Sequence, residues 1–388
     1  MFKRQIEKQL QKMARSFPVI TVTGPRQSGK TTIVKHTFKH KPYANLELLE
    51  TREFAEADPA RFLAQFPEGA ILDEIQRVPS LLSYIQVIVD EKEINGMFVL
   101  TGSHQMELHQ AVSQSLAGRT VLLDLLPMSL LELQEAGIAL SLDEALLKGG
   151  YPRIYKEDLD PTIAYSSYFK TYVERDLRQL IQIKDLGQFQ RFVKLCAGRI
   201  GQLLNLEGIG NEVGVSSHTI KHWISILEAS FIIVRLQPYY ENIGKRLVKA
   251  PKLFFTDVGL ASYLLGIENT QQMSRDPQRG HLFENLVLLE LMKARLNRGL
   301  DPHLYFFRDA QGHEVDFIYK SGHELIPIEA KSAETFSRSL FKGLDFFSNL
   351  LPEKTPKGFL IYAGNAEQAV GSYEVLNYQH ASTITNTN

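Results

Sequence analysis

The feature that most constrains this chain is a glycine-rich loop that follows a short apolar run. Residues 24–31, here called the P-loop, read Gly-Pro-Arg-Gln-Ser-Gly-Lys-Thr and match G-x-x-x-x-G-K-[ST], between a predicted strand at 19–23 and a predicted helix from Lys30. In such a loop the backbone N–H groups face phosphates, and the lysine reaches the β- and γ-phosphates. A glycine-rich turn with an incidental lysine is the other interpretation, and it gives no reason for the strand and the helix. We expect ATP to contact Gly24, Pro25, Arg26, Gln27, Ser28, Gly29, Lys30, Thr31 and Thr32.

A second apolar run ends in two acids. Residues 70–74 read Ala-Ile-Leu-Asp-Glu, so Asp73 and Glu74 follow a predicted strand directly. One carboxylate placed in this way holds Mg²⁺, here together with the hydroxyl of Thr31, and the other orients or deprotonates the attacking water. The pair therefore predicts ATP hydrolysis rather than binding alone. An ordinary helix cap made by Asp73 is the alternative.

Two further features belong to the same part of the chain. A predicted strand at 97–101 ends in Thr-Gly-Ser-His-Gln, which places Ser103 at the carboxyl edge of a sheet, where ligands bind. Ser103 then contacts the γ-phosphate, or the segment is a loop of small polar residues with local hydrogen bonds. Arg119 is either an arginine finger that acts on the ATP of a neighbouring subunit or a surface arginine.

Composition narrows the class of protein. The net charge of -1 excludes a protein that coats nucleic acid through its overall charge, so any contact with DNA is local. Cys196 is the only cysteine, and no apolar leader or run of about 18 apolar residues is present, which favours the cytoplasm and excludes a membrane span. With no partner for Cys196 at ligand spacing, we expect no zinc site.

The motifs together resemble a known superfamily. The P-loop, the acidic pair, the strand that ends at Ser103 and the segment 115–119 resemble the AAA+ ATPases. The segments 149–152, 172–176, 280–285 and 314–317 look like a widespread prokaryotic group of AAA+ proteins with a C-terminal domain of unknown function. The resemblance covers nearly the whole chain and implies an ATPase with DNA-related modules.

Four residues near the C-terminus resemble the active-site pattern of restriction-endonuclease-like, PD-(D/E)xK nucleases. Glu284 lies on a predicted helix, Asp316 in one predicted strand, and Glu329 and Lys331 on one face of the next strand, because side chains alternate. The resemblance implies that Asp316 and Glu329 hold Mg²⁺, that Glu284 completes the metal shell and that Lys331 positions the water. A solvated ion pair in an inactive binding scaffold is the alternative.

The middle of the chain predicts a winged helix-turn-helix. A helix begins at the serine cap Ser216, and an apolar face leaves Thr219, Lys221 and His222 outside, where such modules meet DNA. A purely structural module that packs domains together is the alternative. Nearby, Lys245, Arg246, Lys249 and Lys252 form a basic cluster that touches phosphates or a loop that is solvated.

The predicted fold class is α/β with five parts, because 388 residues exceed one ordinary core. We expect an AAA+ parallel-sheet core at 1–130, a helical lid or connector at 131–200, the winged module and a linker at 201–270, a restriction-endonuclease-like domain at 271–376 and a disordered tail at 377–388.

The leading functional hypothesis is a Mg²⁺-dependent ATPase that processes DNA, with branched or damaged DNA as partner, and that assembles as a homo-oligomeric ring. The alternative is a regulatory or phage-defence switch whose nuclease-like domain is an inactive docking surface. A protein-remodelling ATPase is a third reading, which the sequence neither supports nor excludes.

Overall fold

The computed structural model describes residues 1–103, 115–174, 185–240 and 248–386. The chain divides into two compact units, which are described separately. Unit 1 comprises Met1–Met128, Ala229–Phe231 and Leu296–Leu300, and unit 2 comprises Ser129–Glu228, Ile232–Arg295 and Asp301–Asn388. Several residues of the predicted motifs lie outside the described residues, namely His104, Gln105, Arg175, Asp176, Lys245 and Arg246.

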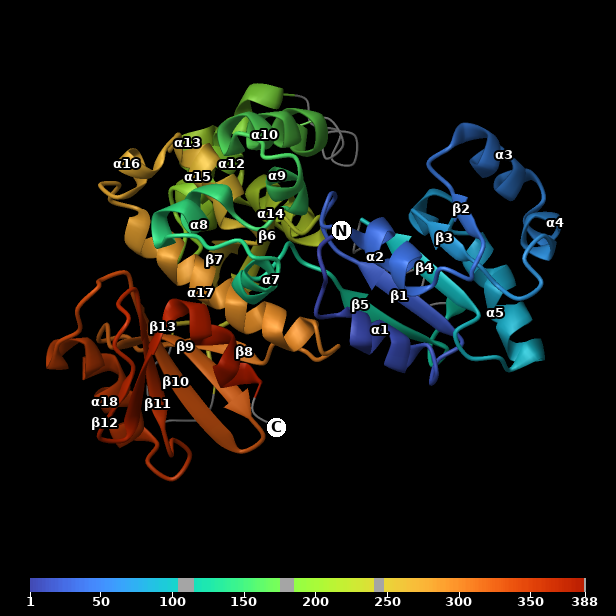
Figure 1. Ribbon diagram of the computed structural model, residues 1–388. Coiled ribbons are helices and arrows are strands. Elements are labelled where there is room, and N and C mark those ends of the chain that lie inside the picture. Colours follow the sequence, from blue (N-terminus) through green and yellow to red (C-terminus); the bar gives the residue numbers. More distant parts are fainter. Residues whose placement is uncertain (104–114, 175–184, 241–247, 387–388) are drawn as a thin grey trace. The chain divides into compact units, whose positions relative to one another are not determined.

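Unit 1 is built on a five-stranded parallel sheet with the order β2-β3-β4-β1-β5 (Figure 1). Strand β4 lies between β1, which leads into the P-loop, and β3, which carries the acidic pair. The carboxyl ends of all three strands therefore meet at one edge. The predictions of β1, β3 and β4 are confirmed within a residue or two, and β2 and β5 were not predicted. The strands are β1 Val19–Thr23, β2 Tyr43–Asn45, β3 Ile71–Asp73, β4 Phe98–Gly102 and β5 Thr120–Asp124.

Helices cover both faces of this sheet because the strands are apolar on both sides. Val19 and Phe98 belong to one buried cluster, whereas their neighbours Ile20 and Val99 belong to the other. Burial on both faces fixes the strand register and, with it, the position of the P-loop. The helices are α1 Glu7–Met13, α2 Lys30–Thr37, α3 Leu49–Ala57, α4 Pro59–Ala64 and α5 Leu81–Lys92, with a short turn η1 Ile75–Arg77.

Unit 2 begins with helices, as predicted for 131–200, in the residues of that range that the structure describes. Two helices around the turn at Gly214, followed by an antiparallel pair of strands, β6 and β7, supply the elements that a winged helix-turn-helix needs. That identification itself stays a prediction. The elements are α7 Leu130–Glu135, α8 Leu142–Lys148, α9 Pro152–Lys156, α10 Pro161–Tyr168, η2 Phe169–Glu174, α12 Leu186–Ala197, α13 Leu206–Val213, α14 Ser217–Ala229, β6 Ile233–Leu236, β7 Lys252–Phe255, α15 Val258–Leu265 and α16 Thr270–Met273.

The Gly-Gly-Tyr-Pro segment has a structural explanation. Gly149 adopts φ +60, and a Cβ there would lie 2.3 Å from Asp257 Oδ1. The N–H of Gly150 donates to Asp257 Oδ2 at 2.7 Å, and the hydroxyl of Tyr165 donates to Asp257 Oδ1 at 2.6 Å. This buried carboxylate, which also caps α15, ties the turn to α10 and α15.

The C-terminal part is a six-stranded mixed sheet with the order β12-β13-β11-β10-β9-β8, next to the long helix α17 (Figure 1). Helix α18 packs on β9 and β10. The elements are α17 Arg279–Leu296, β8 Leu304–Arg308, β9 Glu314–Ser321, β10 Glu324–Lys331, η3 Arg338–Phe341, α18 Lys342–Leu350, β11 Gly358–Tyr362, β12 Gln368–Val370, β13 Tyr373–Asn377 and η4 Tyr378–Thr385.

The prediction of a disordered tail from 377 is wrong for η4. Tyr378, Ala381 and Ile384 are buried, and the Thr385 hydroxyl donates to the carbonyl of Leu291 in α17 at 3.1 Å. Most residues of this segment are polar, but its three apolar side chains share one face of a short helix. Within the described ranges no helix is long and apolar enough to cross a membrane.

Candidate functional site

The P-loop connects β1 to α2 through backbone conformations that need glycine. Gly29, the N-cap of α2, has φ +96, and Gly24 has φ +146. A Cβ on Gly24 would lie 2.2 Å from the carbonyl oxygen of Leu125, so the backbones of the two residues touch. Both glycines are therefore fixed by geometry, which explains the spacing of the motif.

Lys30 begins α2 and is nearly fully buried. Its ammonium donates to the carbonyls of Gly24 and Pro25 at 2.9 and 2.8 Å and so lies across the mouth of the loop. Burial lowers the pKa of Lys30 to about 8, although the carboxylates of Glu74 and Asp73 oppose this shift. A polyphosphate beside this ammonium adds negative charge and stabilises its protonated form.

Asp73 ends β3 and accepts hydrogen bonds from three hydroxyls. Thr31 donates from the first turn of α2 at 3.0 Å to either carboxylate oxygen, Tyr43 donates at 2.7 Å from β2, and Thr101 donates from β4. The contacts of Asp73 are thus to hydroxyls around the P-loop rather than to a helix end. A hydroxyl and a carboxylate side by side are oxygen donors of the kind that Mg²⁺ takes, so Thr31 and Asp73 fit this ion.

Glu74 follows in the left-handed region, at φ 58 and ψ 48, which is rare for a residue with a side chain. Its N–H donates to Thr101 Oγ1 at 3.2 Å, and its Oε2 accepts from the hydroxyl of Ser103 at 3.1 Å and from the amide of Gln76. The predicted residue Ser103 therefore contacts Glu74. Sequence analysis missed Tyr43, Thr101 and Gln76 as contacts of the two acids.

Three other predicted residues lie apart from the acids. Arg119 precedes β5, where its carbonyl accepts from the N–H of Val19, so it lies at the amino edge of the sheet, opposite the P-loop. Its guanidinium donates to both oxygens of Asp90 at 2.5 and 2.7 Å. Arg119 therefore does not reach the P-loop of its own chain. Arg26 pairs with Glu47 at 3.3 Å, and Thr32 is exposed on α2.

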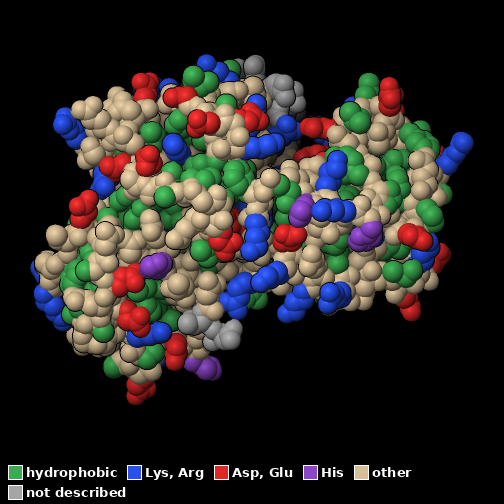
Figure 2. Space-filling model, in the orientation of Figure 1, with side chains coloured by type: hydrophobic (Ala, Val, Ile, Leu, Met, Phe, Trp, Pro, Cys, Tyr) green, Lys and Arg blue, Asp and Glu red, His purple; other side chains and the backbone are tan. Residues whose placement is uncertain are grey.

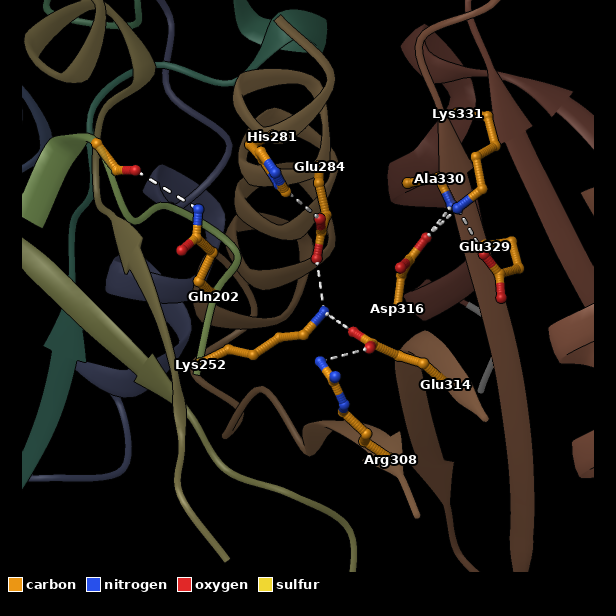
Figure 3. A network of polar contacts seen from close by, with 11 residues as sticks. Gln202, Lys252, His281, Glu284, Arg308, Glu314, Asp316, Glu329, Ala330 and Lys331 are labelled. Atoms are coloured by element: carbon orange, nitrogen blue, oxygen red, sulfur yellow. Dashed lines mark hydrogen bonds and ion pairs between the residues drawn. The ribbon is translucent and has the colours of Figure 1, made fainter. Parts of the chain in front are cut away.

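A second polar cluster lies in unit 2, where Asp316 of β9 meets two side chains of the adjacent strand β10 (Figure 3). Lys331 donates to Asp316 Oδ2 at 2.8 Å and to Glu329 Oε2 at 2.7 Å, and the N–H of Ala330 donates to Asp316 Oδ2 at 3.0 Å. The strand pairing thus brings the three predicted residues together.

Glu284 has a different partner. Its Oε1 accepts from the buried ammonium of Lys252 at 3.0 Å, and Lys252 also pairs with Glu314 at 2.6 Å, which in turn pairs with Arg308 at 3.1 Å (Figure 3). In the part of the chain that the structure describes, no three His, Cys, Asp or Glu side chains are grouped to hold a metal. Glu284 contacts Lys252 rather than Asp316 and Glu329, and the expected metal shell of these three residues stays a prediction.

The charges of this cluster are strongly shifted. Burial raises the pKa of Glu329, and the Asp316 carboxylate raises it further. Burial opposes ionisation of Asp316, but Lys331 and Lys252 hold its pKa well below the usual range. Burial also opposes charge on Lys252, yet the carboxylates of Glu284, Asp316 and Glu314 raise its pKa. The acids of the cluster are thus paired with internal cations.

The cluster opens into a cavity of about 650 Å³. Glu284, Asp316 and Lys331 reach it, together with Lys252, Arg308 and Gln202, which sequence analysis did not assign to this site. Glu314 lies two residues before Asp316 on β9, and this spacing could have identified Glu314 from the sequence. Lys252 comes from β7, and no sequence spacing points to it.

Comparisons with known proteins divide the chain into three matched segments. Residues 16–134 match the model of an AAA domain, residues 139–271 a domain of unknown function (DUF8612), and residues 279–381 a domain of unknown function (DUF4143). The second match spans both the predicted lid and the predicted winged module.

Relatives match over most of their length. The uncharacterized proteins Rv2008c of Mycobacterium tuberculosis and Mb2031c of Mycobacterium bovis are each 30% identical over 348 residues, which is 88% of this chain and 77% of the relative. A Haemophilus influenzae protein is 25% identical over 79% of this chain and 81% of its own. Among solved structures, the Walker-type ATPase PABY2304 of Pyrococcus abyssi has a TM-score of 0.46 and 14% identity, over 68% of this chain and 96% of that chain.

Proposed function

This chain belongs to the family of Rv2008c and Mb2031c and is an AAA-type P-loop ATPase, and from this premise we propose that it hydrolyses ATP with Mg²⁺ and couples hydrolysis to DNA. The observation that carries the proposal is the convergence of the P-loop lysine with Asp73 and Glu74 at one sheet edge. Asp73 bonded to Thr31 is the arrangement that Mg²⁺-ATP needs.

In this mechanism each residue has one role. Lys30 and the P-loop N–H groups bind the β- and γ-phosphates. Thr31 and Asp73 would hold Mg²⁺, which neutralises phosphate charge when it is bound. Glu74 accepts the proton of the attacking water, and its contacts with Ser103 and Gln76 hold its carboxylate in place.

Steady-state ATP hydrolysis tests this assignment. Lys30→Ala removes the phosphate ligand and should abolish turnover. Glu74→Gln keeps the shape of the side chain and should reduce turnover by about 100-fold or more while fluorescent ADP still binds. Glu91→Gln, at an exposed position of α5, is the matched control. Equal turnover of Glu74→Gln and Glu91→Gln would remove Glu74 from the mechanism.

Coupling to DNA is supported by the helix pair α13 and α14. Ile220, Trp223, Ile224 and Leu227 are buried, which leaves Lys221 and His222 of α14 exposed. Basic and acidic side chains are both scattered over the face drawn in Figure 2, in keeping with a local rather than a global contact.

The test measures ATP hydrolysis with four-way-junction, duplex and single-stranded DNA. Stimulation by one form would identify the DNA class. Lys221→Ala should weaken this stimulation, whereas Lys8→Ala, an exposed lysine of α1, should not. A rate of ATP hydrolysis that none of the three DNA forms changes would favour the regulatory or defence switch.

A second candidate concerns the DUF4143-matched region, and a specific observation favours it. Lys252 engages Glu284 and Lys331 engages both Asp316 and Glu329, so internal cations already occupy the acids of the nuclease-like cluster. This supports an inactive binding scaffold over a nuclease. Mg²⁺-dependent nicking of DNA by the intact protein, lost in Asp316→Ala and in Lys331→Ala, would overturn the scaffold and establish the nuclease.

A further inference from the structure

Arg4, which belongs to none of the motifs, binds a backbone carbonyl of the P-loop. When the N–H groups of such a loop face phosphates, its carbonyls turn into the protein, where each needs a donor. The carbonyl of Ser28, a fully buried residue, accepts from Arg4 Nη1 at 2.8 Å. Arg4 precedes α1 and is itself only 5% exposed.

The same guanidinium holds a second carbonyl. Arg4 Nη2 donates to the carbonyl of Leu126 at 2.7 Å. Leu126 follows β5 and stands two residues before Met128, after which the chain enters unit 2. Because a guanidinium presents several donors in a fixed plane, it can join two carbonyls that repel each other, whereas a lysine presents one compact ammonium.

A separate backbone contact joins the same two segments. The N–H of Leu125 donates to the carbonyl of Thr23 at 2.8 Å, and the carbonyl of Leu125 lies against Gly24, where a Cβ would approach it to 2.2 Å. The start of the P-loop therefore touches residue 125, while Arg4 ties Ser28, in the middle of the loop, to residue 126. A shift of the loop has to move segment 124–128.

We propose that Arg4 is a positioning residue that clamps the P-loop to segment 124–128, so that nucleotide binding is passed to the chain that enters unit 2. The proposal rests on the proposed nucleotide site at Lys30. Arg4 acts through the carbonyl of Ser28 and not through a phosphate. Its role is therefore to fix the loop in the shape that binds phosphate.

Binding of fluorescent ADP and steady-state kinetics test the clamp. Arg4→Ala should weaken binding by roughly 10- to 100-fold, the usual effect of losing a hydrogen bond to a charged group. The affinity of Arg4→Lys for fluorescent ADP should lie between those of the wild type and Arg4→Ala. Millimolar ethylguanidinium should partly restore the affinity of Arg4→Ala. Arg15→Ala, at an exposed arginine of the same N-terminal segment, is the control and should bind like the wild type.

Hydrogen exchange at segment 124–128 gives the second readout, which a merely structural role would not change. ADP should protect these amides in the wild type, and in Arg4→Ala at saturating ADP it should protect the P-loop but not 124–128. Unchanged binding by Arg4→Ala, or equal protection of 124–128 in both proteins, would overturn the clamp while the ATP site stands. If the wild type binds no nucleotide, the proposed function fails with it. Should Arg4→Ala fail to fold by circular dichroism, Arg4→Lys decides on the same two measurements.

Discussion

Replacing Lys252 by methionine tests what stabilises the polar cluster of unit 2 that contains Glu284 and Asp316. The side chain of Lys252 is 2% exposed and pairs with both Glu284 and Glu314, so Lys252→Met leaves the buried Glu284 without this cation and Glu314 with Arg308 alone. Removing one partner of a buried pair costs about 3–5 kcal/mol. With a urea m-value of about 3 kcal/mol per molar, the unfolding midpoint should fall by about 1 to 1.7 M.

Tryptophan fluorescence makes the measurement specific, because Trp223 is the only tryptophan and lies in unit 2. Arg338→Met, which breaks the exposed pair with Asp345, is the matched control and should cost at most about 1 kcal/mol. Because the pKa of Lys252 is raised above 10.5, its contribution is complete below that pH and is lost only as pH rises through the raised value. The difference between Lys252→Met and the wild type should therefore be constant from about pH 6 to 9. A midpoint shift below about 0.3 M would refute the reasoning, since Lys252 would then behave as a surface charge.

Three further predictions concern unit 1. Because the pKa of Lys30 is lowered to about 8, its charge is present below that pH and is lost above it. The affinity of the protein for fluorescent ADP should therefore fall as the pH rises through 8. If the wild type and Lys30→Ala showed the same dependence of affinity on pH, this prediction would be contradicted. Tyr43→Phe removes one donor to Asp73 and should raise the Mg²⁺ concentration needed for half-maximal hydrolysis by about tenfold, and an unchanged Mg²⁺ titration would show that Tyr43 does not position Asp73. If Arg119 acts on a neighbouring subunit, mixing Arg119→Ala with Glu74→Gln should restore hydrolysis that neither variant has alone, whereas no restoration would leave Arg119 as the surface partner of Asp90.

The sequence predicted best what depends on local spacing. The P-loop and the acidic pair each follow an apolar strand directly, so a short window carries both the element and the polar residues. Strand alternation likewise brought Glu329 and Lys331 to the Asp316 carboxylate. These inferences needed no knowledge of distant parts of the chain.

Contacts between distant segments could not be predicted in this way. Tyr43 reaches Asp73 from a three-residue strand that is too short to show a pattern. Lys252 reaches Glu284 from a strand 32 residues earlier, and Lys252 itself is buried rather than part of a solvated loop. The segment from Tyr378 was called disordered because its apolar residues are few, although they share a face.

The backbone of Glu74 has a consequence for the balance between robustness and activity. A glutamate held in the left-handed region costs of order 1–3 kcal/mol, and glycine adopts the same conformation freely. Glycine at this position would therefore relieve the backbone strain, but it would also remove the carboxylate that the proposed mechanism assigns to the attacking water. Under that mechanism, the cost in folding stability at Glu74 is the cost of keeping a carboxylate at the end of β3.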